Sequence, residues 1–379
     1  MSSIIDFVIT ARPSWSRVKN LIEEYAALEG NDALSITLIG SATSEKYGDI
    51  RGQMPLGITV DSFGTFEGNL NYSSVARTSI LGAQALSYKW DAKRPDSVLV
   101  IADRTETLGV SLAAATMQIP LIHLQGGEIS GSIDNKIRGA NSKLADFHLT
   151  TNQITANNLS DQGEDLKNIR IIGCPSVDIV KKRMSAKVLL PNESSQYGGV
   201  GANFSTTNPF GVILFHPDTF KLSENIEWVN KIIELVDNSD LFWFWFWPNI
   251  DIGGEEIAKI MRIRREKAKF ANVRFLKNIS PEAFIDLAIK SAIMVGNSSF
   301  GIREASFIGL PVVNLGTRQF GRLRADNVTD IKSPEKLIDI VNTKYKKRFK
   351  SSTLYGDGNA AKLGAIELSK WEPKLKENT

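Results

Sequence analysis

The chain has 379 residues, more than one typical hydrophobic core accommodates, so we expect two domains. Its 42% hydrophobic and 23% charged residues are typical of a soluble globular protein, and a net charge of +3 without a block of like charge argues against a nucleic-acid-binding surface. The single cysteine excludes an internal disulfide and a cysteine-cluster metal site, and without a signal peptide or a run of about 18 apolar residues we expect a cytoplasmic protein that does not enter a membrane.

The first half of the chain alternates short β-rich runs with helical patterns. The predicted strands are residues 4–10, 34–40, 56–63, 97–103, 119–125, 147–151 and 169–175. Helices are predicted at 14–30, around 106–118 and near 134–145. Strands that alternate with helices indicate βαβ units, a mostly parallel sheet and right-handed crossovers.

The same alternation restarts after residues 184–210, whose Gly, Ser, Asn and Pro content predicts a linker or long loop. The later predicted strands are 211–217, 241–247, 272–278, 291–297 and 310–316, and later helices are predicted near 333–349 and 359–371. The run FWFWFW at 242–247 is typical of a buried parallel strand rather than a stacking platform. The simplest fold class is α/β, with two Rossmann-like domains facing each other across a cleft, where ligands bind beyond the carboxyl ends of the strands.

Two motifs near the end of this second half are suited to phosphate. In VGNSSFGIRE, Ser298 and Ser299 stand at a helix N-terminus and Glu304 lies where it can reach a ribose diol, although N-capping explains the serines equally well. Arg318 and Arg322 in TRQFGR either support a phosphate or belong to a solvated basic loop.

His216 in ILFHPDTF ends the first strand of the second half. A histidine there can titrate near neutrality and bind a diphosphate or assist its departure, unless it is an ordinary hydrogen-bonded turn residue. Asn249 and Asp251, after the aromatic strand, can approach a nucleotide, but a plain loop is the stronger interpretation.

The first half carries charged residues at its own strand ends. Arg12 follows the first strand and Arg17 begins the next helix, in a loop without the GxGxxG fingerprint, which argues against an NAD enzyme. Asp103 ends another strand, where it is either a site residue or a helix N-cap.

The stretch HLQGGEISGSIDNKIR combines paired glycines with three charged candidates. Glu128, Asp134 and Arg138 can converge around one ligand carbon, where neighbouring carboxylates separate into a proton acceptor and a donor. An i,i+4 salt bridge between Asp134 and Arg138 is the alternative. We interpret His123 as a structural strand-end residue.

In their order along the chain, these motifs resemble the UDP-N-acetylglucosamine 2-epimerase family, in particular the hydrolysing branch from sialic-acid and related nonulosonic-acid synthesis. The resemblance covers about residues 1–330 and implies the two-domain fold called GT-B. It implies an N-terminal domain at 1–183 with the acid/base residues, a linker at 184–210 and a nucleotide-binding domain at 211–355. Residues 356–379 then form a C-terminal helix that packs back on the first domain.

The resemblance also implies a mechanism and a site. The proton at sugar C2 is removed while the nucleotide diphosphate leaves C1, and water adds to the resulting glycal, without a metal or redox cofactor. The implied catalytic residues are Asp103, Glu128, Asp134 and His216. The implied substrate-binding residues are Arg12, Arg17, Arg138, Ser298, Ser299, Gly301, Glu304, Arg318 and Arg322. The implied partners are a UDP-sugar and further copies of the chain, in a dimer or tetramer.

Some residues depart from the family pattern. Hydrolysing members usually have Glu and His where this chain has Asn135 and Gly139, and their first loop reads Gly-Thr-Arg-Ala-Asp where this one reads Thr-Ala-Arg-Pro-Ser. A different acetamidosugar, such as a diacetamido-trideoxyhexose, or a GDP-sugar is therefore compatible with the sequence. A non-hydrolysing epimerase, a GT-B glycosyltransferase and a non-catalytic nucleotide-sugar binding protein stay open as alternatives. A glycosyltransferase leaves the three first-half acids unexplained.

Overall fold

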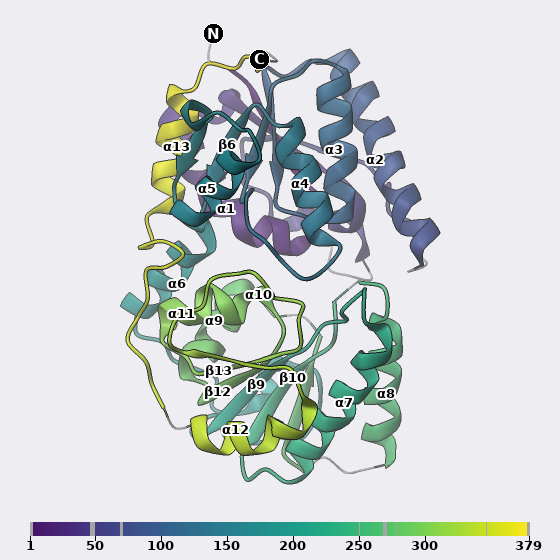
Figure 1. The fold of residues 1–379 in the computed structure, drawn as a ribbon, viewed down its shortest axis with the longest axis vertical. Helices are drawn as coiled ribbons and strands as arrows, with labels where there is room; N and C mark the ends of the chain where they lie inside the picture. The colour runs from purple at the N-terminus through teal and green to yellow at the C-terminus, as the bar shows by residue number, and fades with distance from the viewer. Residues whose placement is uncertain are drawn as a thin grey trace. The chain divides into compact units, whose positions relative to one another are not determined.

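The computed structural model describes residues 3–45, 50–68, 71–249, 251–267, 271–277, 279–345 and 347–376 (Figure 1). The chain divides into two compact units. The first comprises Met1–Ile129, Ile133–Asp178 and Gly356–Thr379, and the second comprises Ser130–Ser132 and Ile179–Tyr355. No helix within the described residues is both long enough and apolar enough to cross a membrane.

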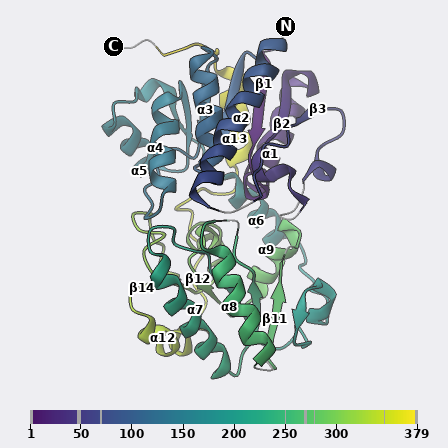
Figure 2. The same ribbon diagram turned by 90° about the vertical axis from the view of Figure 1, so that its right-hand side faces the viewer.

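The first unit is built on a seven-stranded parallel sheet with the order β3-β2-β1-β4-β5-β6-β7. Its strands are β1 Ile5–Ile9, β2 Leu34–Leu38, β3 Thr59–Ser62, β4 Ser97–Ile101, β5 Leu121–Leu124, β6 Phe147–Thr150 and β7 Ile169–Ile171. Figure 2 shows the first three side by side. Every predicted strand of this half overlaps an observed one, and the central strands β1, β4, β5 and β6 are buried runs, whereas the edge strand β3 is partly exposed.

Helices cover both faces of this sheet. They are α1 Arg12–Glu29, α2 Tyr72–Ala92, α3 Thr105–Thr116, α4 Asp134–Leu144, α5 Gln153–Asp161, α6 Pro175–Ser185 and α13 Ala360–Lys370. Alternate residues of β1 point to opposite faces. Phe7 packs in one cluster with α1 and α13, whereas Val8 packs in another with α2 and α3 (Figure 1).

The C-terminal segment belongs to the first unit. Gly364 of α13 packs closely against Leu21, because a Cβ added to Gly364 would lie 2.9 Å from Leu21 Cδ1. Beyond the helix, Trp371 stacks on Phe147 with ring centroids 4.9 Å apart. Residues 356–376 therefore complete the hydrophobic core of this unit.

The second unit has a seven-stranded sheet with the order β14-β13-β12-β9-β10-β11-β8. Its strands are β8 Val200–Gly201, β9 Phe210–Leu214, β10 Phe242–Phe246, β11 Val273–Leu276, β12 Ile293–Gly296, β13 Val312–Leu315 and β14 Val328–Ile331. Its helices are α7 Leu222–Asp237, α8 Gly254–Lys267, α9 Pro281–Lys290, α10 Ser299–Ile302, α11 Glu304–Ile308 and α12 Leu337–Lys344. All strands are parallel except the edge strand β8.

The segment 184–210, predicted as a linker or long loop, belongs to the second unit. Val200 and Gly201 pair antiparallel with β11, and Glu193 forms an isolated bridge with Ser205. Phe204 is buried and stacks on Phe242 with ring centroids 4.6 Å apart. The glycines that suggested a linker allow close backbone approach, since a side chain on Gly201 would collide with the Val273 carbonyl.

The aromatic strand β10 is core, as predicted. Trp243 and Trp245 pack with α7 and α8, and Phe244 and Phe246 pack on the other face of the sheet with residues of α9. All four side chains are buried. Gly211 of β9 is required beside this strand, because a Cβ there would overlap the Trp243 ring.

Both sheets share one topological feature. From β1 in the first sheet and from β9 in the second, the chain winds outward on one side and then returns to wind outward on the other; β8, which precedes β9, pairs with β11 at the edge of the second sheet. The two directions diverge between β1 and β4 in the first unit and between β9 and β12 in the second. In open parallel sheets, ligands bind beyond the carboxyl ends of the strands at such switch points.

Candidate active site

Arg138 joins two of the predicted site residues of the first unit. It lies on α4, is only 2% exposed, and its Nη2 donates to the Asp103 carboxylate at the end of β4. Its Nη1 donates to the Glu128 carbonyl at 2.7 Å. Asp134 is the first residue of α4, one helical turn before Arg138, and is half-buried. The structure therefore brings Asp103, Glu128 and Arg138 together beside a helix that starts with Asp134.

The backbone before Asp103 is held in an unusual conformation. Ala102 has a φ of +57°, which non-glycine residues rarely adopt. Its carbonyl accepts from His123 Nε2 at 2.9 Å and from Asn141 Nδ2 at 3.3 Å. A carbonyl can only accept, so Nε2 carries the proton and Nδ1 accepts from the Ser142 hydroxyl, 3.0 Å away. Burial lowers the pKa of His123 to about 3, so the ring is neutral.

Asn141 and Glu106 are buried polar residues that sequence reasoning left out of the site. Asn141 also donates to Thr107 Oγ1 at 2.7 Å and accepts from Ser111 Oγ at 2.8 Å, which ties α4 to α3. Glu106 pairs with Arg104 at 3.3 Å and lies where a Cβ on Gly40 would approach its Cγ to 3.1 Å. An asparagine within a helix carries no pattern that marks it in a sequence, whereas Glu106 lies three residues after Asp103 and could have been found from that spacing.

Arg12 and Arg17 follow β1 and lie in the first turns of α1. Both are half-buried, and burial lowers the pKa of Arg12. Because β1 and β4 are neighbours, the loop of Arg12 and the loop of Asp103 leave the sheet side by side at the switch point.

In the second unit, five residues form a closed ring of hydrogen bonds and an ion pair. The Asn297 side chain accepts from the His216 N–H and donates to the His216 carbonyl, both at 2.8 Å. Arg318 Nη1 donates to the Asn297 carbonyl at 3.3 Å, and its Nη2 lies 3.4 Å from the Asp251 carboxylate. Asn249 closes the ring through its Nδ2 to Asp251 at 2.7 Å and its backbone N–H to His216 Nδ1 at 3.3 Å.

This ring changes two sequence-based interpretations. His216 was expected to titrate near neutrality, but burial, with Arg318 next, lowers its pKa to about 3. The His216 imidazole is therefore neutral at pH 7. The second concerns Asn249 and Asp251, which are not a plain loop but partners of two predicted site residues.

The arginine loop after β13 is also fastened down. Gln319 is fully buried, donates to the Asn297 carbonyl at 2.8 Å and accepts from Arg322. Arg324 pairs with Asp330 of β14 at 2.9 Å. Within the second unit, the Gly131 N–H donates to the Arg318 carbonyl at 3.1 Å. The interpretation of this loop as merely solvated is therefore wrong.

The motif after β12 forms two short helices rather than one. Ser298 caps α10 by accepting from the Phe300 N–H at 3.4 Å, and Ser299 Oγ accepts from Arg303 at 3.0 Å. Glu304 is buried and begins α11 after a break at Arg303. Gly301 faces the sheet, since an added Cβ would lie 3.0 Å from Val312. The missing side chain therefore lets α10 pack closely on β13.

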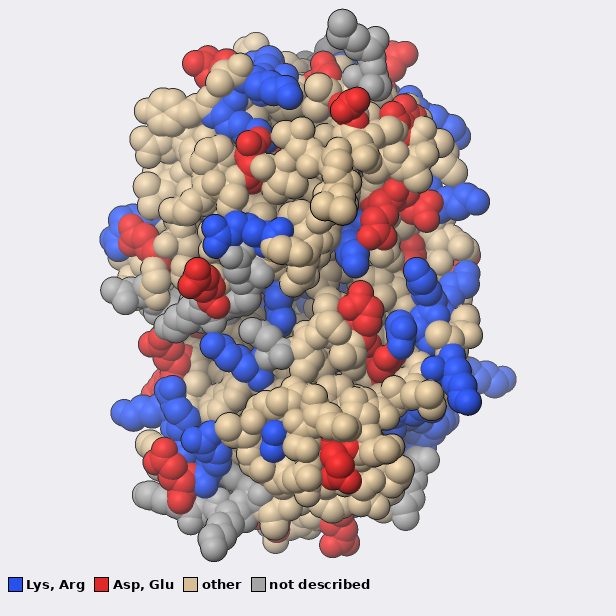
Figure 3. All heavy atoms as spheres, turned by 180° about the vertical axis from the view of Figure 1, so that it is seen from behind, with Lys and Arg blue, Asp and Glu red and all other residues tan. Residues whose placement is uncertain are grey.

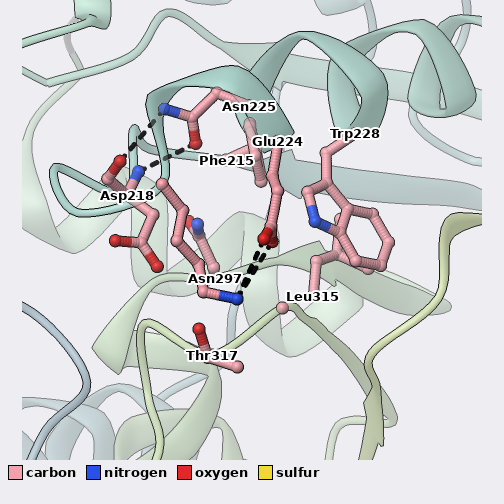
Figure 4. A pocket seen from close by; sticks show the side chains of 10 residues that line it. Phe215, Asp218, Glu224, Asn225, Trp228, Asn297, Leu315 and Thr317 are labelled. Atoms are coloured by element: carbon pink, nitrogen blue, oxygen red, sulfur yellow. Dashed lines mark hydrogen bonds and ion pairs between the residues drawn. The ribbon is translucent and has the colours of Figure 1, made fainter.

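A small pocket lies next to the ring and shares Asn297 with it (Figure 4). Its other lining residues include Phe215, Thr317, Asp218, Glu224 and Trp228. Asn225 donates to the Asp218 carbonyl and accepts from its N–H, and Lys221 pairs with Glu224 at 3.0 Å. On the face shown in Figure 3, acidic and basic side chains are interspersed.

Two α/β units with this shared strand order define a protein of the GT-B-like class. The structure resembles a *Methanocaldococcus jannaschii* UDP-GlcNAc 2-epimerase in complex with UDP-GlcNAc and UDP, with a TM-score of 0.79 and 16% identity over 97% of this chain and 99% of that one. It also resembles a UDP-GlcNAc 2-epimerase from *Neisseria meningitidis* bound to UDP-GlcNAc, with a TM-score of 0.77 and 18% identity over 98% and 100% of the two chains. At these identities the likeness shows the fold.

Residues 27–365 match the family model described as UDP-N-acetylglucosamine 2-epimerase, so the chain belongs to this family and is an enzyme. One curated relative, from *Legionella pneumophila*, is named UDP-N,N'-diacetylbacillosamine 2-epimerase (hydrolyzing). It is 29% identical over 368 residues, which cover 94% of this chain and 93% of the relative. Another, polysialic acid biosynthesis protein P7 from *Escherichia coli*, is 26% identical over 76% of each chain.

Proposed function

We propose that this enzyme is a hydrolysing nucleotide-sugar 2-epimerase. It converts UDP-N-acetylglucosamine, or a related UDP- or GDP-acetamidosugar, into the free 2-epimer and the nucleotide diphosphate. The observation that carries the proposal is the contact of Arg138 with both the Asp103 carboxylate and the Glu128 main chain. It gathers acidic groups at the switch point of the first sheet, where the family's proton chemistry requires them.

The roles within the first unit follow from charge. Arg138 compensates the Asp103 carboxylate and fixes its orientation. Glu128 and Asp134 act as the acid/base pair at sugar C2: one removes the proton while the diphosphate leaves C1, and a glycal forms. Water then adds across the glycal double bond. Its hydroxyl goes to C1, and a proton is added to C2 on the face opposite to the one from which the first proton was removed. Arg12 and Arg17 offset the charge of the departing diphosphate.

The second unit contributes nucleotide-binding residues in this proposal. His216 and Arg318 donate to diphosphate oxygens, Ser298 and Ser299 supply hydroxyl donors, and Glu304 accepts from the ribose hydroxyls. Arg322 supports this loop through Gln319. Support comes from the neutral, donor form of His216 and from relatives whose solved structures contain UDP or UDP-GlcNAc.

A labelling experiment tests the reaction. The enzyme is incubated in deuterated water with UDP-GlcNAc, UDP-diacetamido-trideoxyhexose and GDP-linked analogues, and deuterium at C2 and free nucleotide are followed. We expect one deuterium at C2 and equal amounts of nucleotide diphosphate and free epimerised sugar. Deuterated sugar that stays attached to the nucleotide identifies a non-hydrolysing epimerase, and sugar transfer to an acceptor without labelling identifies a glycosyltransferase.

Amide variants test the acid/base assignment. Glu128→Gln and Asp134→Asn are expected to reduce C2 labelling by at least 100-fold, because an amide neither accepts nor donates the proton. Glu23→Gln, on an exposed acid of α1 that lies 3.9 Å from Lys19, is the control and should be as active as the wild type. Near-normal labelling by either site variant contradicts the assignment.

We also propose that the enzyme is cytoplasmic, acts in nonulosonic (sialic-type) acid synthesis and forms a homo-oligomer, a dimer or tetramer. The similarity to the polysialic acid biosynthesis protein supports the pathway. Exposed apolar residues on α2 and α3, among them Ile80, Tyr88 and Leu112, support self-association. Light scattering tests the assembly: a monomer at working concentration contradicts it, and Ile80→Lys with Leu112→Lys should weaken it.

A further inference from the structure

The ring around His216 lies at the carboxyl ends of four neighbouring strands. The sheet order places β13, β12, β9 and β10 side by side, and the ring takes one or two residues from the loop after each. In chain order these residues are His216, Asn249, Asp251, Asn297 and Arg318. Because it closes on itself, each member is held from two sides, which fixes the orientation of the side chains that face a ligand.

The bonds of the ring determine the form of His216. The Asn249 backbone N–H can only donate, so His216 Nδ1 must be its unprotonated acceptor and Nε2 must carry the hydrogen. The Asn249 side chain is tied in turn to Asp251 at 2.7 Å. Asp251 therefore holds Asn249, and the backbone N–H of Asn249 selects the tautomer of the His216 imidazole.

Asp251 also holds Arg318. The two side chains are 19% and 12% exposed, so water screens the pair little. Arg318 Nη2 donates to the Asp251 carboxylate at 3.4 Å, and the Asn297 carbonyl accepts from Nη1, the other terminal nitrogen of the guanidinium. The guanidinium is thus held between two loops.

We propose that Asp251 is the positioning residue that orients both donors to the nucleotide diphosphate, Arg318 directly and His216 through Asn249. The inference rests on the proposed function, which supplies the diphosphate ligand. Asp251 carries a negative charge, so a carboxylate that merely lay nearby would repel the diphosphate. A positioning role predicts the opposite: without the carboxylate, UDP binds more weakly.

This difference in sign gives the experiment. UDP affinity is measured by calorimetry for the wild type and Asp251→Asn, with Asp237→Asn as the matched control in an Asp–Arg pair with Arg264 at 2.6 Å. We expect Asp251→Asn to weaken UDP binding about tenfold, which corresponds to about 1.4 kcal/mol, and Asp237→Asn to leave it unchanged. Unchanged or tighter binding by Asp251→Asn overturns the proposal.

A double-mutant cycle tests the route through Arg318. In an Arg318→Met background, which removes the guanidinium, we expect Asp251→Asn to change UDP affinity less than twofold. Full additivity of the two substitutions contradicts the route. Thermal unfolding of each variant shows whether a loss of UDP binding comes from misfolding. The variant Asp251→Glu keeps the negative charge and should recover part of the UDP affinity.

Nitrogen NMR of the histidine side chains separates this inference from the proposed function. The chain has three histidines, so a His216→Gln spectrum identifies the His216 signals. We expect the Nε2–H tautomer in the wild type without UDP and a mixture of tautomers in Asp251→Ala. An unchanged tautomer in Asp251→Ala overturns the positioning of His216. A different result is that the wild type binds no nucleotide but the His216 tautomer still changes in Asp251→Ala. That result contradicts the proposed function and leaves the positioning of His216 standing.

Discussion

The His123 imidazole donates its Nε2–H to the Ala102 carbonyl at 2.9 Å, one residue before Asp103. The bond holds a peptide whose φ of +57° is costly for alanine. His123, interpreted from the sequence as a structural strand-end residue, therefore maintains the backbone that presents the Asp103 carboxylate. In the neutral ring, Nε2 donates to Ala102 while Nδ1 accepts from the Ser142 hydroxyl.

The first prediction concerns pH. Burial lowers the pKa of His123 from 6.5 to about 3 in the folded chain. Between these values the unfolded chain binds a proton that the folded chain does not, so the free energy of unfolding falls as the pH falls from 6.5 toward 3, and above 6.5 it is unaffected. The slope is at most about 1.4 kcal/mol per pH unit for each such histidine.

Urea unfolding at pH 7, 6 and 5 measures this slope. His123→Gln keeps an amide donor for Ala102 but does not titrate, so we expect a shallower slope than in the wild type. His216 has the same direction of shift and keeps part of the slope in the variant. Equal slopes for the wild type and His123→Gln would contradict the buried neutral histidine.

The second prediction concerns the buried Arg138–Asp103 pair. Replacing one partner leaves the other charge buried, so Arg138→Met is expected to lower the free energy of unfolding by about 3–5 kcal/mol. The double variant Arg138→Met, Asp103→Leu should recover much of this loss. Chemical denaturation monitors both. A double variant as unstable as the sum of the single ones argues against a direct pair.

How far the sequence predicts this fold depends on how each element is buried. The central strands follow from their apolar runs, but β14, Val328–Ile331, was missed because it is a partly exposed edge strand. Helix α2 was missed for a different reason. It packs on α3 through small residues, with Ser79 lying against Gly109, while Ile80 and Tyr88 face outward, so its pattern lacks an apolar stripe.

The site divides in the same way. Charged residues after strands, such as Asp103 and Arg318, are visible in sequence because parallel strands end at one edge. The neutral state of His216 cannot be seen in the sequence, since it depends on burial and on the backbone N–H of Asn249, which belongs to a separate loop. The same holds for Asn141, whose importance lies in contacts to residues 30 to 39 positions away.

The third prediction compares two glycines near the site. A Cβ on Gly126 would lie 2.9 Å from both His123 Nδ1 and Ser142 Oγ, so Gly126→Ala should break the bond between them and destabilise the first unit. Gly139, within α4, has no atom within 4 Å of an added Cβ. Gly139→Ala should therefore stabilise the helix by about 0.5–1 kcal/mol. Thermal unfolding of the two variants checks the opposite signs; a loss of stability in Gly139→Ala contradicts the open space at that position.

The fourth prediction concerns substrate preference at the same position. Hydrolysing relatives are expected to carry histidine where this chain has Gly139, one turn after the exposed Asn135. An added Cβ at Gly139 meets no atom within 4 Å, so the start of a side chain is accommodated there. If the residue at this position determines which acetamidosugar is accepted, Gly139→His should raise kcat/KM for UDP-GlcNAc relative to UDP-diacetamido-trideoxyhexose, with Gly139→Ala as the control for helix stability. Equal ratios in the wild type and in both variants place the choice of sugar elsewhere in the site.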